Sequence, residues 1–308
     1  MRRKLEVILI ASLAAACGYA QSAAPAPALP SVDDIGVLKV QGNVYMLVTA
    51  AGNIAAQEGD DGILVVNTGT EAFAPQVAAA LKKLAAKPIL WVVNTDAAPA
   101  HIGGNDALPR LSGLAPRQQP RIVAYENVLD RVSHRQPRVP DALWPNDEYF
   151  SPTKDFSFNG EAIEVYHVPN ALTDGDSMVH FRRSDVLATG DVFTPGRYPV
   201  IHTDQGGTIQ GELDALNQIL RITVPLKYEE AGTYVIPGRG RLCDEADVVE
   251  YRNMVTIVRD RIRALAAKDN TLEQVRAARP TRDYDTQYDK ASADAFVEAI
   301  FKTVANKK

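Results

Sequence analysis

A short apolar run, Ile89–Val93, leads directly into the polar stretch Asn94–Asn105, which ends in two glycines and an asparagine. Five consecutive apolar residues predict a strand that is buried on both faces. Gly103 and Gly104 predict a sharp turn that allows a helix to pack closely. Because a rigid strand end fixes the side chains that follow it, we expect the residues that carry chemistry to lie at this junction.

Apolar patterns on both sides of the junction predict further strands and helices. The predicted strands are Val37–Val40, Val44–Thr49, Asn53–Gln57, Ile63–Val66, Ile122–Tyr125, Ala162–Val168, Met178–Phe181 and Val186–Leu187. The predicted helices are Glu71–Ala86, Glu126–Val132, Asp244–Lys268, Thr271–Ala278 and Ala291–Val304. Short connections between the first four strands are typical of an antiparallel meander. This order of elements favours helices packed on a sheet.

The first twenty residues have the pattern of a signal peptide. A basic start is followed by the apolar stretch Val7–Ala16 and by the small-x-small sequence Gly18-Tyr-Ala20. We therefore expect residues 1–20 to direct export, to the periplasm or the medium, and residues 21–35 to form an Ala/Pro linker. The alternative is a membrane-anchored lipoprotein, because Cys17 also fits a lipid-attachment sequence.

Composition excludes several classes of partner. The chain has a net charge of −5 and no basic run after the signal, which argues against a nucleic-acid partner. No later apolar run reaches the ~20 residues of a membrane span. Cys243 is the only cysteine left after the signal, so we expect the core rather than disulfides to stabilise the fold.

Several separate motifs resemble those of the metallo-β-lactamase superfamily and follow in the same order. The family's Asn-Thr followed by His-x-His-x-Asp-His and x-Gly-Gly-Asn corresponds to Asn94–Asn105. The later motifs correspond to Ala171-Leu-Thr-Asp-Gly-Asp176, Thr189-Gly-Asp191, Tyr198-Pro-Val-Ile-His202 and Ile236-Pro-Gly-Arg-Gly240. The resemblance implies a four-layer αββα sandwich over residues 36–268, and we expect residues 269–308 to form a C-terminal helical extension.

The resemblance also implies where two zinc ions would bind, and most of those positions have lost their ligands. The ligand motif falls on Asp96, Ala98, Ala100 and His101, and the next two metal-binding histidines correspond to Leu172 and Arg239; the bridging aspartate, Asp191, is kept. A binuclear site needs about six or seven N and O donors, and arginine cannot ligate a metal. The family's aspartate that orients a metal-bound histidine corresponds to Asn67. We therefore predict that the zinc pair is lost.

Charge suggests what replaces the zinc. Asp96 and Asp191 would be two carboxylates in one pocket, and the hypothesis is that Arg239 pairs with Asp191. In the alternatives, His101 caps backbone and Asp191 only accepts backbone N–H groups. Other polar residues have simpler roles: Asp174 and Asp176 are expected in turns, and a new site built on His167 and His202 is disfavoured.

Two functions from different classes remain. The first is an exported pseudoenzyme or accessory protein that binds an unknown small molecule or protein and no cofactor. The second is a hydrolase for an ester, lactone or amide, with a metal-free site or one divalent metal on Asp96, His101 and Asp191. The sequence leaves open whether the Pro-rich stretch Gln118–Pro152, with Trp144, covers the pocket. A buried, anchoring tryptophan is the simpler expectation.

Overall fold

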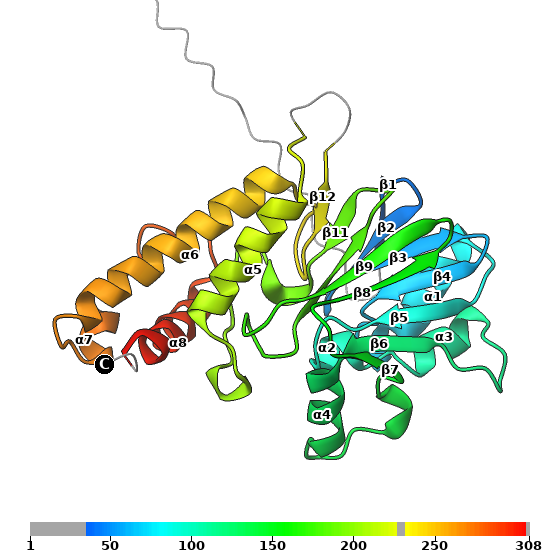
Figure 1. The fold of residues 1–308 in the computed structure, drawn as a ribbon, viewed down its shortest axis with the longest axis horizontal. Coiled ribbons are helices and arrows are strands. Elements are labelled where there is room, and N and C mark those ends of the chain that lie inside the picture. Colours follow the sequence, from blue (N-terminus) through cyan, green and yellow to red (C-terminus); the bar gives the residue numbers. More distant parts are fainter. Residues whose placement is uncertain (1–34, 227–231, 306–308) are drawn as a thin grey trace, which may run out of the picture.

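The chain is described from a computed structural model that covers residues 35–226 and 232–305. Two sheets face each other, and helices cover the outer face of each one (Figure 1). The four-layer αββα sandwich is therefore confirmed. The predicted signal peptide, and all of the linker except its last residue, lie outside the described residues.

The first sheet has seven strands in sequential order. They are β1 (Gly36–Gln41), β2 (Val44–Thr49), β3 (Gly52–Gly59), β4 (Gly62–Val66), β5 (Ile89–Val93), β6 (Arg121–Tyr125) and β7 (Asp147–Tyr149). The predicted antiparallel meander is confirmed for β1–β4. Strands β4 to β7 are parallel. The short strand β7 lies in the Pro-rich stretch, where no strand was predicted.

The second sheet has five strands in the order β12-β11-β10-β9-β8. They are β8 (Thr153–Phe158), β9 (Glu161–His167), β10 (Ser177–Phe181), β11 (Val186–Ala188) and β12 (Tyr234–Ile236). Strands β8 to β11 are antiparallel to their neighbours, whereas β12 joins β11 in parallel.

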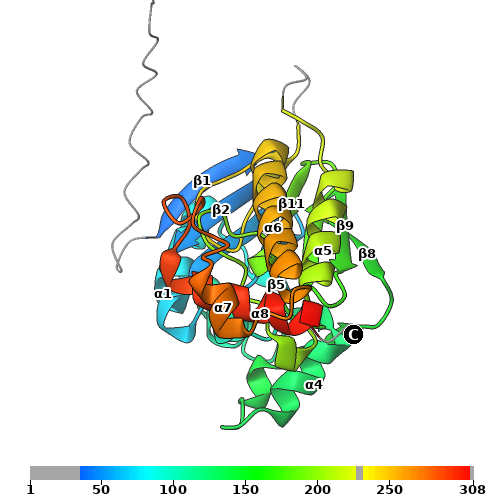
Figure 2. The ribbon, with the colours of Figure 1, turned by 90° about the vertical axis from the view of Figure 1, so that its left-hand side faces the viewer.

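Helices form the two outer layers. The α-helices are α1 (Ala74–Leu84), α2 (Pro99–Ile102), α3 (Ala107–Ser112), α4 (Glu126–His134), α5 (Ile209–Ile222), α6 (Glu245–Ala266), α7 (Leu272–Ala277) and α8 (Ala293–Ala305). The short 3-10 helices are η1 (Glu71–Phe73), η2 (Asp141–Leu143), η3 (Gly190–Val192), η4 (Thr203–Gln205) and η5 (Lys290–Ser292). Helices α1 and α3 pack on the first sheet (Figure 1). Helices α5, α6 and α8 cover the second (Figure 2).

The alternation of side chains along each strand builds two cores at once. On β2, Val44 and Met46 face the second sheet, whereas Leu47 faces α1. On β5, Val93 packs between the sheets and Val92 packs under the helices, as the prediction of burial on both faces requires. None of these five side chains is more than 2% exposed, so both faces of β2 and of β5 are closed to water at these residues.

The predicted C-terminal extension packs on the rest of the chain. Helix α8 contacts both α5 and α6, and α7 contacts α6 and α8. Phe296 on α8 is fully buried and stacks on Tyr198, with 5.5 Å between ring centroids. In the structure this segment completes the helical layer over the second sheet. The predicted boundary at residue 268 stays a prediction.

The Pro-rich stretch is tied down by its tryptophan. The indole nitrogen of Trp144 donates to the Val139 carbonyl at 3.0 Å, and the ring packs beside the buried Val128 and Val132 of α4. This is the anchoring role expected for it. Among the described residues, no helix is both long and apolar enough to cross a bilayer.

Three loops from different strands meet at one edge of the sandwich. Asp96, Asp191 and Arg239 each follow three residues after a strand end, at Val93, Ala188 and Ile236. Backbone hydrogen bonds join the two sheets at this edge: Ser177 N donates to Thr95 O at 2.8 Å, and Asn53 N donates to Gly238 O at 2.8 Å. The fold therefore brings together the three loops that carry the residues of the predicted site.

Candidate functional site

The turn after β5 places Asp96 above the short helix α2. Its Oδ1 accepts the backbone N–H of Ala98 at 2.7 Å, which closes a tight turn before Pro99 starts the helix. One turn later, His101 returns its ring to the same carboxylate. The sequence thus builds a local contact between two residues only five positions apart.

The imidazole of His101 lies between two carboxylates. Its Nδ1 is 2.7 Å from Oδ1 of Asp96, and its Nε2 is 3.7 Å from Oδ1 of Asp191. One ligand-type atom from each of the three residues lies within 4.8 Å of the others. The structure therefore brings together the three residues that were predicted to remain from the metal site.

This arrangement holds a positive charge on His101. The ring is 2% exposed, and burial alone would lower its pKa, but the Asp96 and Asp191 carboxylates raise the pKa to about 9. Burial opposes the charge of Asp96, yet the imidazolium keeps the pKa of Asp96 below its ordinary value. The pair is consequently an ion pair at neutral pH.

Asn67 supports this ion pair through its neighbour Thr95. Its backbone is left-handed, with φ of 64°, a conformation that asparagine tolerates well. The side-chain oxygen accepts Thr95 N–H at 2.9 Å, and the amide donates to the Thr95 hydroxyl at 3.0 Å. Asn67 therefore fixes the strand end that carries Asp96 and makes no hydrogen bond to His101.

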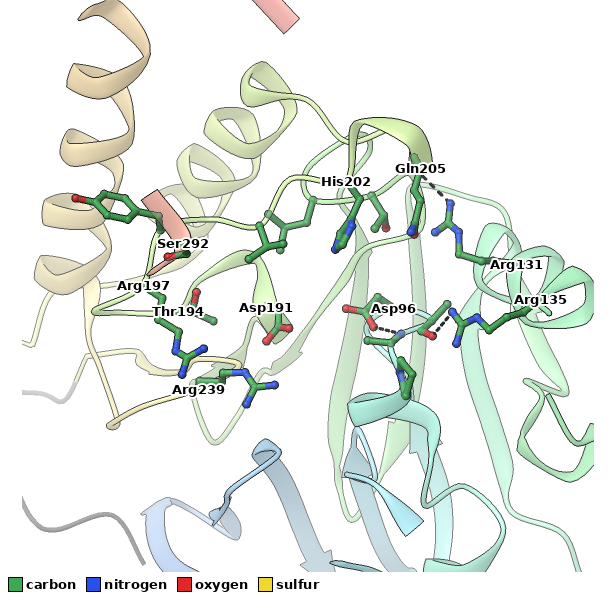
Figure 3. Close-up of a pocket in the computed structure, with 17 residues that line it drawn as sticks. Asp96, Arg131, Arg135, Asp191, Thr194, Arg197, His202, Gln205, Arg239 and Ser292 are labelled. Carbon is green, nitrogen blue, oxygen red and sulfur yellow. Dashed lines mark hydrogen bonds between the residues drawn. The ribbon is translucent and has the colours of Figure 1, made fainter. Parts of the chain in front are cut away.

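A cavity of about 250 Å³ opens above the two carboxylates (Figure 3). Among its lining residues are Asp96, Asp191, Leu172, Tyr198, Val200 and His202, together with the four arginines Arg131, Arg135, Arg197 and Arg239. His101 is not among them, because it is buried beneath Asp96 and Asp191. In Figure 3, Arg197 and Arg239 lie on the Asp191 side, and Arg131 and Arg135 lie beyond Asp96.

The predicted pairing of Arg239 with Asp191 is wrong. Within the described ranges no ion pair joins them; Nη1 of Arg239 lies 3.5 Å from the Ala50 carbonyl instead. The two alternatives are wrong as well. The His101 ring contacts carboxylates rather than backbone, and the buried Oδ1 of Asp191 has no hydrogen-bond partner among the described residues. The sequence did not reveal that the nearest cation to both carboxylates is His101 itself.

The donors present do not fit a zinc pair. Two of the lost ligand positions, Ala98 and Leu172, line the cavity with aliphatic side chains, and Arg239 brings a cation to a third. Ala100, on α2, has no donor to offer either. Among the described residues, the only group of three side chains whose ligating atoms lie within 4.8 Å of one another is Asp96, His101 and Asp191, and Nδ1 of His101 is already engaged with Asp96.

The other polar residues singled out have structural roles, with one exception. His167 stacks on Tyr125 with 3.4 Å between centroids. Asp174 pairs with Arg131 at 2.6 Å, and Asp176 accepts Thr173 N–H at 2.6 Å within its turn. His202 is the exception, because it lines the cavity. The structure does not gather His167 and His202 into a new site.

Three of the four cavity arginines were not predicted. Arg131 and Arg135 come from α4 and its C-terminal end, and Arg197 follows η3. No motif marks them. The only available signal was the four-residue spacing of Arg131 and Arg135, which would place two guanidinium groups on one side of a helix, but the predicted helix ended at Val132.

Comparisons with known proteins agree on the fold. A family model described as the metallo-beta-lactamase superfamily matches residues 39–230. A solved structure of the stereoselective inverting sec-alkylsulfatase Pisa1 from Pseudomonas sp. is similar with a TM-score of 0.61 and 15% identity, over 89% of this chain and 50% of that one. This chain therefore spans half the length of the sulfatase.

Two shorter structures are matched almost completely. The metallo-beta-lactamase from Pontibacter korlensis has a TM-score of 0.56 and 15% identity, over 72% of this chain and 99% of that one. The DIM-1 metallo-beta-lactamase has a TM-score of 0.56 and 16% identity, over 73% of this chain and 99% of that one. A search of curated proteins gave no match.

Proposed function

The chain belongs to the metallo-beta-lactamase superfamily, and from that premise we propose that it is an exported member without a zinc pair, which binds a small molecule in the cavity above Asp96 and Asp191. The export part of the proposal rests on the signal-like residues 1–20. Fractionation of the producing cell tests it.

One observation carries the loss of the zinc pair. Where the family's ligands would converge, an imidazole lies 2.7 Å from one carboxylate and 3.7 Å from another, and the remaining ligand positions hold alanine, leucine and arginine. The imidazolium of His101 supplies internally the positive charge that the two carboxylates need. An imidazolium has no free lone pair for a metal, so binding an ion there requires loss of the proton.

The position of His101 favours binding over acid–base catalysis. A general base must reach the proton that it removes, within about 2.6–3.2 Å or through one water. His101 is buried below the cavity floor, so a bound molecule meets Asp96 and Asp191 first. The His101 proton is thus placed to stabilise the floor of the cavity.

A second candidate is a hydrolase with a single divalent metal. The closeness of donor atoms from Asp96, His101 and Asp191, all within 4.8 Å, favours it. Two carboxylates and one imidazole are suitable ligands for several divalent metals. The similar solved structures include a sulfatase and β-lactamases, so the fold alone does not choose an ester, a lactone or an amide as its substrate.

Restoring the lost ligands is expected to create zinc binding. We would combine Asp96→His, Ala98→His, Ala100→Asp, Leu172→His and Arg239→His, which return four imidazoles and one carboxylate. Equilibrium dialysis should then show about two zinc ions per chain in the variant and no stoichiometric zinc in the parent. The single variant Arg239→His is the control, because it removes the cation without completing either ion's ligand set.

Two results would count against the proposal. A parent protein that binds two zinc ions would show that the present residues suffice. A restored variant that folds, as judged by circular dichroism, and still binds no zinc would show that these positions do not converge as a metal site.

A further inference from the structure

The cavity contains more positive charge than its own acids balance. Four arginines line it against two aspartates, in a chain whose net charge is −5. Both aspartates already have His101 as their neighbouring cation. Among the described residues, none of the four guanidinium groups forms an ion pair with either of these aspartates.

Three of these arginines have no ion pair within the described residues. Arg131 is satisfied by Asp174, at 2.6 Å. Arg135 donates only to the Ala97 carbonyl at 2.7 Å, and Arg239 reaches only the Ala50 carbonyl. The Arg197 side chain has no hydrogen bond to any residue in the ranges 35–226 and 232–305. Arg197 is itself exposed, and several other exposed arginines of this chain do pair with an acid, as Arg138 does with Asp141 at 2.8 Å.

Like charges gathered in one cavity raise its energy unless an anion joins them. Burial and the nearby charge of Arg131 lower the pKa of Arg135 more than the charge of Asp96 raises it. A guanidinium fork is suited to the two oxygens of a carboxylate or to a phosphoryl group. The ligand that would pair with these unpaired guanidinium groups is therefore an oxyanion.

A second cavity, of about 510 Å³, indicates where the charged group of such an oxyanion would lie. It is lined by Val48, Thr49, Gly52 and Asn53 from the β2–β3 hairpin, and it shares Arg197 and Arg239 with the first cavity. These two arginines therefore lie at the junction of both spaces. The first cavity adds apolar surface from Leu172 and from Val200, which is 51% exposed.

We propose that the cavity binds a small organic anion whose charged group lies between Arg197 and Arg239 (Figure 3) and whose apolar part lies over the lining residues Leu172 and Val200. This inference rests on the proposed function, because it assigns the ligand class of that cavity. Leu172 then has a role of its own: the side chain at the position of a lost metal ligand supplies apolar contact.

Calorimetric titration of the full chain, dialysed against EDTA, tests the ligand class. The probes are hexanoate, which carries a planar anion, and hexyl phosphate, which carries a tetrahedral one; hexan-1-ol is the neutral control. At least one anion should bind and the alcohol should not. The tighter of the two anions identifies the oxyanion geometry, and affinity should fall as NaCl is raised.

Arginine variants test the position. Arg197→Gln and Arg239→Gln should each raise the Kd of the bound anion about 10- to 100-fold, since hydrogen bonds between charged groups are lost. Arg197→Lys should recover part of the affinity, because it keeps the charge and loses the fork. The matched control is Arg117→Gln, which removes one exposed guanidinium that does not line the cavity.

The outcomes separate the two proposals. Each titration is repeated on protein that was not dialysed and on dialysed protein with added zinc. Failure of both anions to bind in all three samples, equal binding of hexan-1-ol, or EDTA-resistant binding that is unchanged in the arginine variants would overturn this inference alone. Binding that disappears on EDTA dialysis and returns with zinc would show that a metal holds the anion, which overturns the proposed function.

Discussion

Replacing His101 with leucine is expected to lower the free energy of unfolding by about 3–5 kcal/mol at neutral pH, because it leaves buried carboxylates without their cation. Leucine fills a similar volume, so the loss of charge dominates over the loss of packing. For a chain of this size the change corresponds to a drop of roughly 10 °C in the melting temperature. Thermal unfolding followed by circular dichroism measures it.

A second substitution shows whether charge is the cause. Adding Asp96→Asn to His101→Leu removes the carboxylate that lies 2.7 Å from the ring, and it should recover part of the stability. The control is His134→Leu, since His134 pairs with Asp130 at the surface and both side chains are more than three-quarters exposed. A His101→Leu protein as stable as its parent would mean that the carboxylates do not depend on the imidazolium.

The stability of the native protein is expected to fall as the pH rises toward 9. Burial opposes the His101 charge, but Asp96 and Asp191 raise its pKa from 6.5 to about 9. A histidine whose pKa is raised by folding stabilises the fold fully below its unfolded pKa, and this contribution is lost as the pH passes the folded value. The loss between pH 6.5 and a pH above 9 is about 3 kcal/mol.

Other buried acids also contribute to the pH dependence of stability. Burial raises the pKa of Asp176 from 3.8 to about 7. Ionisation of this carboxyl therefore lowers the stability mainly between pH 3.8 and pH 7. Burial also raises the pKa of Glu212, whose two carboxyl oxygens have no hydrogen-bond partner among the described residues. Urea unfolding at several pH values, compared between the parent and His101→Leu, isolates the His101 contribution. Parallel curves for the two proteins above pH 7 would contradict the assignment.

Most of the fold could be predicted because its strands and helices follow simple apolar periods. The run Ile89–Val93 is apolar throughout and becomes the doubly buried β5. The predicted helix Asp244–Lys268 becomes α6, which Asp244 caps in a capping box with Asp247. Several motifs in the correct order then identified the arrangement of layers, which local periodicity alone does not determine.

The elements that were missed lack such periods. Helix α5 has Glu212 on its buried face, where an apolar residue is expected, and this hides the amphipathic pattern. Its N-cap, Thr208, which accepts Gly211 N–H at 2.9 Å, was the available signal. Strands β7 and β12 have three residues each, too few for a period to show, and β8 is an edge strand with alternate polar residues.

The residues of the site could be predicted from the sequence, but the contacts between their side chains could not. Motif positions placed Asp96, His101 and Asp191 at one edge, and there the structure gathers them. The sequence could not show that His101 turns its ring between the two carboxylates, since that depends on the tight turn at Asp96 and on side-chain rotamers. The hypothesis therefore chose Arg239 as the compensating cation. The arginine lining was missed because it comes from segments that no motif connects.

The central claim is that an imidazolium between two carboxylates has replaced a metal pair. Elemental analysis of the full chain, purified without chelator, tests it most directly. The account predicts zinc, iron and manganese each far below one equivalent per chain. One ion per chain that is lost in His101→Ala would instead support the single-metal hydrolase, and two ions per chain would contradict the account altogether.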